Sequence, residues 1–374
     1  MAVLAGVFLD REAACGLPAL AGDANRGPKS FSAQNPFRSR APVSATLDVL
    51  TIGNAIVDVI ARADEAFLAA QGMPKGSMTL IDEAKAEAIY AAMGAGTEIS
   101  GGSAANTAVG AATLGARTAF IGKVREDKLG QSFAHDIRAA KVAYATPLAS
   151  DGPTTARCLI LVTPDGERTM NTYLGAAQNL TTADLDAELV KGAAITYLEG
   201  YLWDPPPAKE AFLAAAGIAH GAGREVALTL SDSFCVDRYR AEFLELMRKN
   251  VVDLVFCNEA ELKSLYETAD VDSALIQLRR DVASAVVTRS ERGALFVAKD
   301  AVVTAPAYPV DRVVDTTGAG DLFAAGFLAG RTRGLDPATS LRLGALSASE
   351  VISHVGARPE RNLLDLARET GLLA

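Results

Sequence analysis

Short apolar runs alternate with longer amphipathic stretches along the chain from about Asp48 onward. The apolar runs are rich in β-branched residues and are closed by glycine or polar residues, as buried strands are. The alanine-rich stretches between them have helical spacing. The order strand, helix, strand predicts a doubly wound, mostly parallel α/β sheet flanked by helices, with ligands at the carboxyl ends of its strands. The expected strands are 49–52, 118–121, 194–198, 226–230, 254–257 and 284–288, and the expected helices include 84–93, 107–114, 208–215 and 237–249.

Residues 155–173 interrupt this alternation. Two extended segments are joined by Thr163-Pro-Asp-Gly166, in which Pro164 fixes a negative φ and Gly166 permits a positive one. We expect a β hairpin here, and a hairpin inserted into an α/β chain is a candidate lid over an active site. Residues 56–67 follow the first strand and are expected to pair with the hairpin, so that 56–67 and 154–174 form a small β lid. An ordinary surface hairpin is the alternative.

Composition limits the class of protein and its partners. The chain has 374 residues, 49% hydrophobic and 22% charged, which fits one principal domain over residues 47–374. The net charge of -9 argues against nucleic acid or an anionic membrane as partner and favours a small diffusible substrate. No apolar run reaches the length of a membrane helix. We expect a cytoplasmic monomer or homodimer with reduced, buried cysteines, because the four cysteines lack metal-ligand spacing: Cys15, Cys158, Cys235 and Cys257.

Residues 1–46 differ from the rest of the chain. They carry arginines and a lysine among serines, with no acid between Asp23 and Asp48. We expect a disordered N-terminal extension. A transit segment to an organelle is the alternative, although the acidic Asp10 and Glu12 do not suit it.

The strongest local motif is Asp315-Thr-Thr-Gly-Ala-Gly-Asp321, which precedes the helical stretch 322–331. Its three small residues let successive backbone N–H groups turn toward one point, and the dipole of the following helix adds positive potential there. The turn can therefore cradle a phosphate or a developing oxyanion, with Asp321 at its rim. Two interpretations of Asp321 remain open from these residues alone: a helix cap that accepts backbone N–H bonds, or a group that acts on a ligand.

Two further segments offer ligand-binding groups. In Ser100-Gly-Gly-Ser-Ala-Ala-Asn106, the glycines permit close backbone approach and the Asn106 amide can bind hydroxyls; a small-residue helix start is the alternative. In Asn258-Glu-Ala-Glu261, an amide and a carboxylate three residues apart suit a water-coordinated Mg²⁺ beside phosphates. A helix capping box is the alternative for this second pair.

Together and in this order, the three segments resemble the ribokinase or PfkB family of carbohydrate and nucleoside kinases over about residues 48–360. The resemblance implies a ribokinase-like fold and a phosphotransferase that moves the γ-phosphate of ATP to an alcohol hydroxyl. A dinucleotide-dependent oxidoreductase is disfavoured, because no G-x-G-x-x-G follows the first strand. A family member that has lost catalysis and persists as an interaction protein remains a further alternative.

The resemblance also implies roles for matching residues. Asp321 is expected to be the catalytic base, with an anion hole formed by the N–H groups of Gly318, Ala319 and Gly320. Asp58 is expected to bind sugar hydroxyls together with Gly101, Gly102, Ser103 and Asn106.

Asn258 and Glu261 are expected to hold Mg²⁺ through water, and a monovalent cation such as K⁺ is a further candidate cofactor. The residues expected near ATP are Asn258, Thr288, Gly293, Thr317, Gly318, Gly320 and, as the weakest candidate, His354. Arg289 and Ser290 replace the family's more usual Leu-Gly, so the contacts of that loop stay open.

Three further segments bear on which molecule accepts the phosphate. The segments 172–177, 199–203 and 230–238 look most like the adenosine-kinase-like branch, which implies the 5′ hydroxyl of a purine nucleoside and a role in purine salvage. A purine needs an apolar or aromatic slot. Tyr201, Trp203, Phe234 and Phe120 are candidates for it, and each is equally a candidate for the core. The alternative is a kinase of a free sugar, such as ribose, fructose or a ketodeoxy acid.

Overall fold

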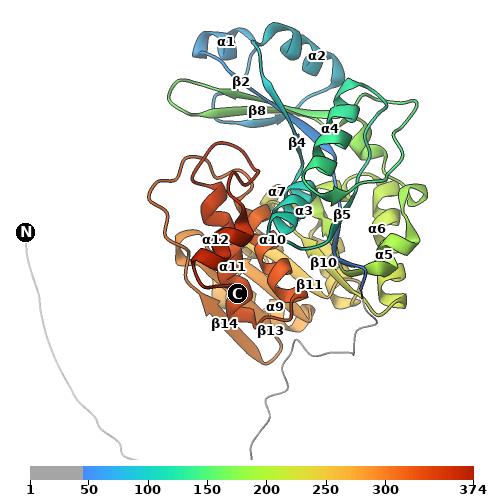
Figure 1. The fold of residues 1–374 in the computed structure, drawn as a ribbon, viewed down its shortest axis with the longest axis vertical. Helices are drawn as coiled ribbons and strands as arrows, with labels where there is room; N and C mark the ends of the chain where they lie inside the picture. Colours follow the sequence, from blue (N-terminus) through green and yellow to red (C-terminus); the bar gives the residue numbers. More distant parts are fainter. Residues whose placement is uncertain (1–44) are drawn as a thin grey trace, which may run out of the picture. The chain divides into compact units, whose positions relative to one another are not determined.

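The computed structural model describes residues 45–374, which form a nine-stranded and a five-stranded β sheet (Figure 1). The mostly parallel α/β fold expected from the sequence is confirmed. The expectations for the N-terminal extension and for Cys15 fall outside the described residues, apart from Ala45 and Thr46. Within residues 45–374, no helix is long and apolar enough to cross a membrane.

The larger sheet has the strand order β14-β13-β12-β11-β10-β9-β1-β5-β6. Its strands from β6 to β12 pair in parallel, and β13 and β14 extend the sheet with antiparallel pairs. The carboxyl ends of β1, β9, β10, β11 and β12 therefore meet at one edge. The strands are β1 (Leu47–Ile52), β5 (Thr118–Ile121), β6 (Val142–Ala143), β9 (Ala193–Glu199), β10 (Glu225–Thr229), β11 (Leu254–Asn258), β12 (Ser284–Thr288), β13 (Ala294–Ala298) and β14 (Ala301–Ala305).

Helices cover both faces of this sheet. One face packs in a single apolar cluster against α5 (Ala187–Gly192), α6 (Pro206–Gly221), α7 (Ser233–Arg248), α8 (Glu259–Leu265) and α9 (Val271–Asp281). The other face carries α3 (Ser103–Thr113), α10 (Ala319–Thr332) and α11 (Pro337–Val351), with α12 (Leu363–Glu369) outside them. Helix α3 begins at Ser103, four residues before its expected start, so Ser103 and Asn106 both lie in its first turn.

The smaller sheet has the order β3-β8-β7-β2-β4 and contains the expected hairpin, whose strands pair antiparallel. Its strands are β2 (Ile56–Arg62), β3 (Met78–Leu80), β4 (Thr97–Gly101), β7 (Ala156–Val162) and β8 (Arg168–Tyr173). β2 pairs in parallel with β7. The sequence predicts an extended segment over 56–67, but β2 ends at Arg62, because the Asp64 side chain caps a helix. β3 and β4 are not predicted from the sequence.

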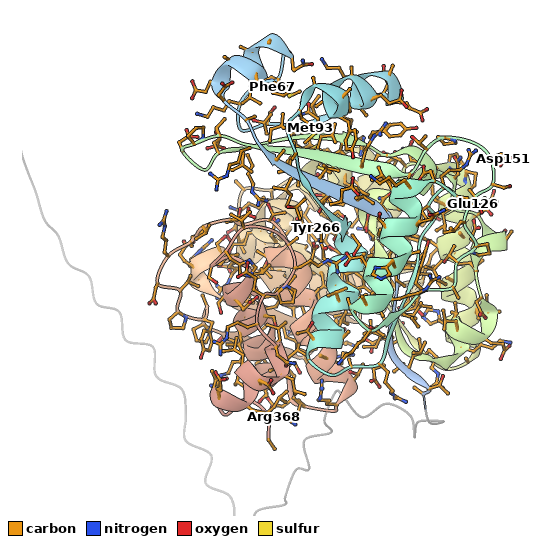
Figure 2. The ribbon with its side chains drawn as sticks, turned by 45° about the horizontal axis from the view of Figure 1, so that its top comes forward. Phe67, Met93, Glu126, Asp151, Tyr266 and Arg368 are labelled. Atoms are coloured by element: carbon orange, nitrogen blue, oxygen red, sulfur yellow. The ribbon has the colours of Figure 1, made fainter. Side chains whose placement is uncertain are left out.

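Three helices accompany the smaller sheet: α1 (Glu65–Ala70), α2 (Glu83–Ala92) and α4 (Lys128–Ala139). Phe67 and Met93, labelled in Figure 2, pack against the apolar cluster that joins these helices to Val57, Val59 and the rest of that sheet face. Helix α4 contacts β4 and β2 of the smaller sheet and β6 of the larger one. It therefore connects the two sheets.

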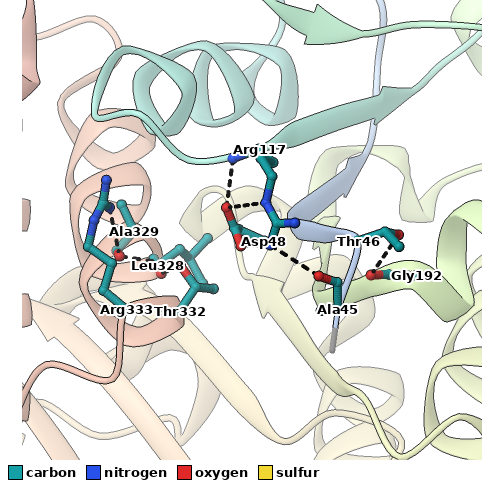
Figure 3. A network of polar contacts seen from close by, with 9 residues as sticks. All are labelled: Ala45, Thr46, Asp48, Arg117, Gly192, Leu328, Ala329, Thr332 and Arg333. Carbon is teal, nitrogen blue, oxygen red and sulfur yellow. Dashed lines mark hydrogen bonds and ion pairs between the residues drawn. The ribbon is translucent and has the colours of Figure 1, made fainter. Parts of the chain in front are cut away.

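The start of β1 is tied to β5 by a charged contact (Figure 3). The Arg117 guanidinium and backbone N–H donate to the Asp48 carboxylate, and the shortest ion-pair distance is 2.7 Å. Thr46 donates to the carbonyl of Gly192 at the end of α5. These bonds fix the point at which the described chain enters the sheet.

Small residues let α3, α10 and α11 pack closely. A Cβ on Gly110 of α3 would lie 2.5 Å from Leu322 Cδ1 and 2.8 Å from Ala325 Cβ of α10. A Cβ on Gly326 of α10 would meet the backbone of Leu343 and Gly344 in α11. The helix that begins at the Gly-Ala-Gly-Asp motif is thus held at a distance that no larger side chain at these glycines permits.

We expect Gly326→Ala to destabilise the fold by about 1 to 3 kcal/mol, because the added methyl group must displace backbone atoms of α11. Gly217→Ala in α6 is the matched control, since nothing lies within 4 Å of its Cβ position. That change should raise stability by about 0.5 to 1 kcal/mol through helix propensity. Urea unfolding measures both. Equal changes in the free energy of unfolding in the two variants would contradict the close approach of α10 and α11.

Candidate active site

Asp321 lies in the first turn of α10 and points at α3. Its Oδ1 accepts a hydrogen bond from Ser103 Oγ at 2.6 Å, and its Oδ2 accepts one from Asn106 Nδ2 at 2.9 Å. The interpretation of Asp321 as a helix cap is wrong, because the N-cap residue of α10 is Gly318 and no side chain caps this helix. The carboxylate is instead shared with the segment 100–106, here called the acceptor turn.

The segment 315–321, here called the anion turn, leaves the N–H groups at the start of α10 without a side-chain cap. Gly318 has a φ of 76°, which only glycine adopts readily, and a Cβ there would lie 2.7 Å from Ala357 Cβ. Nothing lies within 4 Å of a Cβ position on Gly320. The Ala319 N–H donates to the Thr316 carbonyl at 3.2 Å. N–H groups without a side-chain cap at the positive end of a helix, with open space beside Gly320, suit a phosphate.

Asp315 holds the anion turn in place. Its Oδ1 accepts bonds from the N–H and hydroxyl of Thr317, and its Oδ2 accepts one from the Gly356 N–H at 2.8 Å. The Arg168 guanidinium of β8 lies 2.7 Å from the same Oδ2, in a pair whose side chains are 10% and 6% exposed. The smaller sheet therefore reaches the anion turn through a buried ion pair.

The acceptor turn faces Asp58 of β2. Asp58 pairs across the sheet with Ile99 and Cys158, and a Cβ on Gly101 would lie 2.6 Å from its Cγ. Gly101 thus leaves room for the Asp58 carboxylate beside the helix that carries Ser103 and Asn106. The expected acceptor residues are brought together.

Glu199, at the end of β9, ties the first strand to the acceptor turn. Its buried carboxylate accepts bonds from the side-chain amide of Asn54 at 2.7 Å and from the Ala104 N–H at 2.8 Å. Within residues 45–374, the Oδ1 atoms of Asn54 and Asn106 are buried without a hydrogen-bond partner. Two unsatisfied acceptors and two carboxylates are groups that suit a ligand rich in hydroxyl donors.

Burial sets the proton affinity of these carboxyls. It raises the pKa of Asp58 to about 7 and that of Glu199 to about 7, and the nearby Asp321 charge adds to both effects. Arg358 and Arg168 oppose the rise at Asp58. Burial also raises the pKa of Asp321 above its usual value, against the hydrogen bonds from Ser103 and Asn106 and the charge of Arg358. A carboxylate with a raised pKa is a stronger proton acceptor when ionised.

The segment 258–261 forms the capping box that the sequence offers as an alternative. The Glu261 N–H donates to Asn258 Oδ1, and the Asn258 N–H donates back to Glu261 Oε2 at 3.1 Å. Burial raises the pKa of Glu261 to about 7, so a nearby cation would stabilise its charge. Among the described residues, no cluster of three His, Cys, Asp or Glu side chains could hold a metal directly. A role of this pair on Mg²⁺ through water stays a prediction.

Thr288 ends β12 beside Asn258, with which it is in register, and Gly293 turns the chain into β13 with a φ of 84°. His354 lies two residues before Gly356, with its Nε2 3.4 Å from Glu350 Oε1. Its place near ATP stays a prediction.

The four aromatic candidates for a purine slot separate into two pairs. Phe120 and Trp203 are 0% and 3% exposed and belong to apolar clusters, so of the two interpretations left open for them the core holds. Tyr201 is 38% exposed and Phe234 is 77% exposed. Both follow carboxyl ends of strands, β9 and β10 respectively.

Four residues that meet at this edge were not predicted as site residues: Asn54, Arg168, Glu199 and Arg358. Glu199 was detectable as a charged residue that directly follows an apolar run, and Asn54 as part of the same segment as Asp58. Arg168 and Arg358 had no local signal, because each contacts residues more than 100 positions away.

The sequence pattern described as "pfkB family carbohydrate kinase" matches residues 48–362. The chain belongs to this family. Adenosine kinase from Sinorhizobium meliloti is 54% identical, with a TM-score of 0.81 over 87% of this chain and 100% of that one. A probable sugar kinase from Rhizobium etli CFN 42 is 51% identical, with a TM-score of 0.83 over 88% and 100%. Adenosine kinase from Saccharomyces cerevisiae is 28% identical over 83% of this chain and 96% of its own length.

These relatives confirm the adenosine-kinase-like branch within the pfkB family. The protein is a phosphotransferase that uses ATP and takes an alcohol group as acceptor.

We expect Asp58→Asn to change how stability depends on pH. The folded-state pKa of about 7 lies above the ordinary value of 3.8, so the folded state binds the proton more tightly. The resulting stability is fully present below about pH 4 and is lost as the pH rises through about 7. Relative to the native chain, Asp58→Asn should therefore gain roughly 1 to 3 kcal/mol between pH 5 and pH 8 in urea unfolding.

Asp48→Asn is the control of opposite sign. Burial raises the pKa of Asp48, but the hydrogen bonds and charge of Arg117 outweigh it and hold that pKa below its usual value. The stability from Asp48 is present above the unfolded pKa, so Asp48→Asn should be less stable than the native chain at both pH 5 and pH 8. The free energy of unfolding of Asp58→Asn is compared with that of the native chain at pH 5 and at pH 8. The same difference at both pH values would contradict the raised pKa of Asp58.

Proposed function

We propose that the protein transfers the γ-phosphate of ATP to the 5′ hydroxyl of a purine nucleoside, with adenosine as the first candidate. The observation that carries this proposal is an exposed aromatic ring, Tyr201, at the same edge of the sheet as the hydroxyl-binding groups around Asp58. A free sugar needs only the hydroxyl-binding groups and not the aromatic ring. The names of the relatives at 54% and 28% identity support the same acceptor.

The position of Tyr201 suits a nucleobase. Its N–H donates to Ser231 Oγ at 3.0 Å and its hydroxyl donates to the Ser231 carbonyl at 3.3 Å, so the ring is held at both ends. Burial raises the pKa of the Tyr201 hydroxyl, and the charge of Asp232 adds most to that rise, followed by the charges of Asp321, Glu261 and Glu199. A fixed, exposed aromatic face beside a hydroxyl-binding site can stack on a flat base.

Asp321 is the proposed catalytic base. Its carboxylate is oriented by Ser103 and Asn106, which leaves each oxygen a further lone pair for the acceptor hydroxyl. The carboxylate would take the proton from that hydroxyl. The N–H groups of Gly318, Ala319 and Gly320 would stabilise negative charge that develops on the transferred group, because they are already oriented by the helix start.

The nucleotide side has donors that fit phosphates. Among the described residues, the buried Nη2 of Arg168 has no hydrogen-bond partner, and its Nη1 lies 3.3 Å from Thr317 Oγ1. When bound, Mg²⁺ would neutralise phosphate charge, and Asn258 and Glu261 would hold it through water. We also propose that the five-stranded sheet is a lid that excludes water, since β8 contributes Arg168 to the anion turn.

The proposal is tested by ADP release with ATP and Mg²⁺ against adenosine, guanosine, inosine, ribose, fructose and ketodeoxygluconate. We expect turnover with adenosine at least tenfold above that with any free sugar, because only nucleosides use both parts of the site. Selective turnover of a free sugar would replace the nucleoside proposal with the sugar-kinase alternative, to which the Rhizobium etli relative's name points.

We expect Asp321→Asn to keep the fold and to lower kcat by about 10² to 10⁴, because the amide cannot accept the hydroxyl proton. Steady-state kinetics with adenosine measures the loss, and circular dichroism measures the fold. Asp336→Asn is a control at another carboxylate near a helix start, where the side chain caps α11. A kcat within threefold of the native value in Asp321→Asn would remove this residue from the catalytic role.

A further inference from the structure

Arg358 makes a set of bonds that none of the predicted motifs accounts for. It lies between α11 and α12, and its guanidinium donates to the Ser100 carbonyl from Nε at 2.9 Å and from Nη2 at 2.6 Å. Nη2 also lies 3.1 Å from Ser100 Oγ, and Nη1 donates to the Ala105 carbonyl at 2.9 Å. One planar side chain therefore spans the acceptor turn from the residue before its glycines to the first turn of α3.

Ser100 is also held from its other side. Its N–H donates to Asp136 Oδ2 of α4 at 2.7 Å, and Asp136 is in turn a charged neighbour of Arg358. The two glycines that follow Ser100 have no side chains to fix their conformation, and Gly102 has a φ of 98°. The external bonds to Ser100 and Ala105 therefore supply the order that the glycines themselves lack.

The two residues before Arg358 contact the anion turn. The Gly356 N–H donates to Asp315, and Ala357 packs against Gly318 so closely that a Cβ on this glycine would lie 2.7 Å from Ala357 Cβ. Three consecutive residues thus touch the nucleotide side and the acceptor side of the site. A shift of one turn is transmitted to the other through this short connection.

We propose that Arg358 is a positioning residue that sets the acceptor turn, and with it Ser103 and Asn106, in register with the anion turn and Asp321. The role is specific to the acceptor side, because among residues 45–374 the guanidinium hydrogen-bonds only to the acceptor turn. The inference rests on the kinase activity of the family and does not depend on which alcohol is the acceptor.

The charge of Arg358 has a second, separable effect. It lowers the pKa of Asp58 and of Asp321 against the burial that raises both. The other titratable groups whose charges interact with Asp321 are Asp58, Glu199, Tyr197 and Tyr201. None of these is a cation, so loss of the Arg358 charge would raise the pKa of Asp321. The acid limb of the pH profile would then move to higher pH.

The test compares Arg358→Met and Arg358→Lys with Arg361→Met. Arg361 is the matched control, because its side chain is 55% exposed and pairs with Glu369 at the surface. For each variant, kcat and KM are measured for adenosine and for ATP, with the pH profile of kcat/KM and the melting temperature. If the native chain does not phosphorylate adenosine, the nucleoside proposal fails by itself, and the series is run with the panel alcohol that the native chain does phosphorylate.

We expect Arg358→Met to raise the KM of the acceptor about 10- to 100-fold, more than that of ATP, and to move the acid limb to higher pH. Arg358→Lys keeps the charge but not the planar fork, so its acid limb should stay near the native one while its acceptor KM rises. The lysine variant carries the test if the methionine variant does not fold. Native acceptor KM values in the folded variants, or equal losses for acceptor and ATP, would overturn the proposal.

Discussion

The close packing of α3 on α10 is the constraint on which the site depends. Gly110 lets the two helices approach until Ser103 and Asn106 can both bond to the Asp321 carboxylate. A carboxylate at the start of a helix ordinarily bonds to the backbone of that helix, as the N-cap residue Asp336 does at α11. Because α3 supplies two donors from outside, Asp321 keeps a fixed orientation, and no side chain caps the start of its own helix.

The smaller sheet extends this arrangement over the edge of the larger one. β1 ends at Ile52, and β2 begins four residues later in the other sheet, so Asn54 lies in the short connection and Asp58 in the strand that follows it. Glu199 holds Asn54 and the start of α3 together. Arg168 joins the far side of the sheet to Asp315. The same strands thus position the groups that we propose for the acceptor and for the phosphates.

Local sequence predicts much of the fold and of the candidate site. Contacts between distant segments determine the rest. The strands β1, β5, β9, β10, β11 and β12, the hairpin and the three motifs were predictable, because periodicity and glycine-rich turns are local properties. β3 and β4 were not, because β3 is three residues long and β4 ends at Gly101, and both features weaken a strand pattern. The bonds of Arg168 and Arg358 depend on contacts between distant segments. Whether Phe120 and Trp203 lie in the core was not predictable either, since composition does not say which face of an element a ring occupies.

The electrostatics of the site depend on the small number of cationic side chains that balance its carboxylates. Asp58, Glu199 and Asp321 all have raised pKa values, and each is buried near at least one of the others. Arg168 is already paired with Asp315, so Arg358 is the cation that acts on both Asp58 and Asp321. Such a set of acids costs stability near neutral pH. Hydroxyl donors of the proposed acceptor would offset this cost, because each bond to an ionised oxygen favours the charged form. In the proposed reaction, acceptor binding and ionisation of Asp321 are therefore linked.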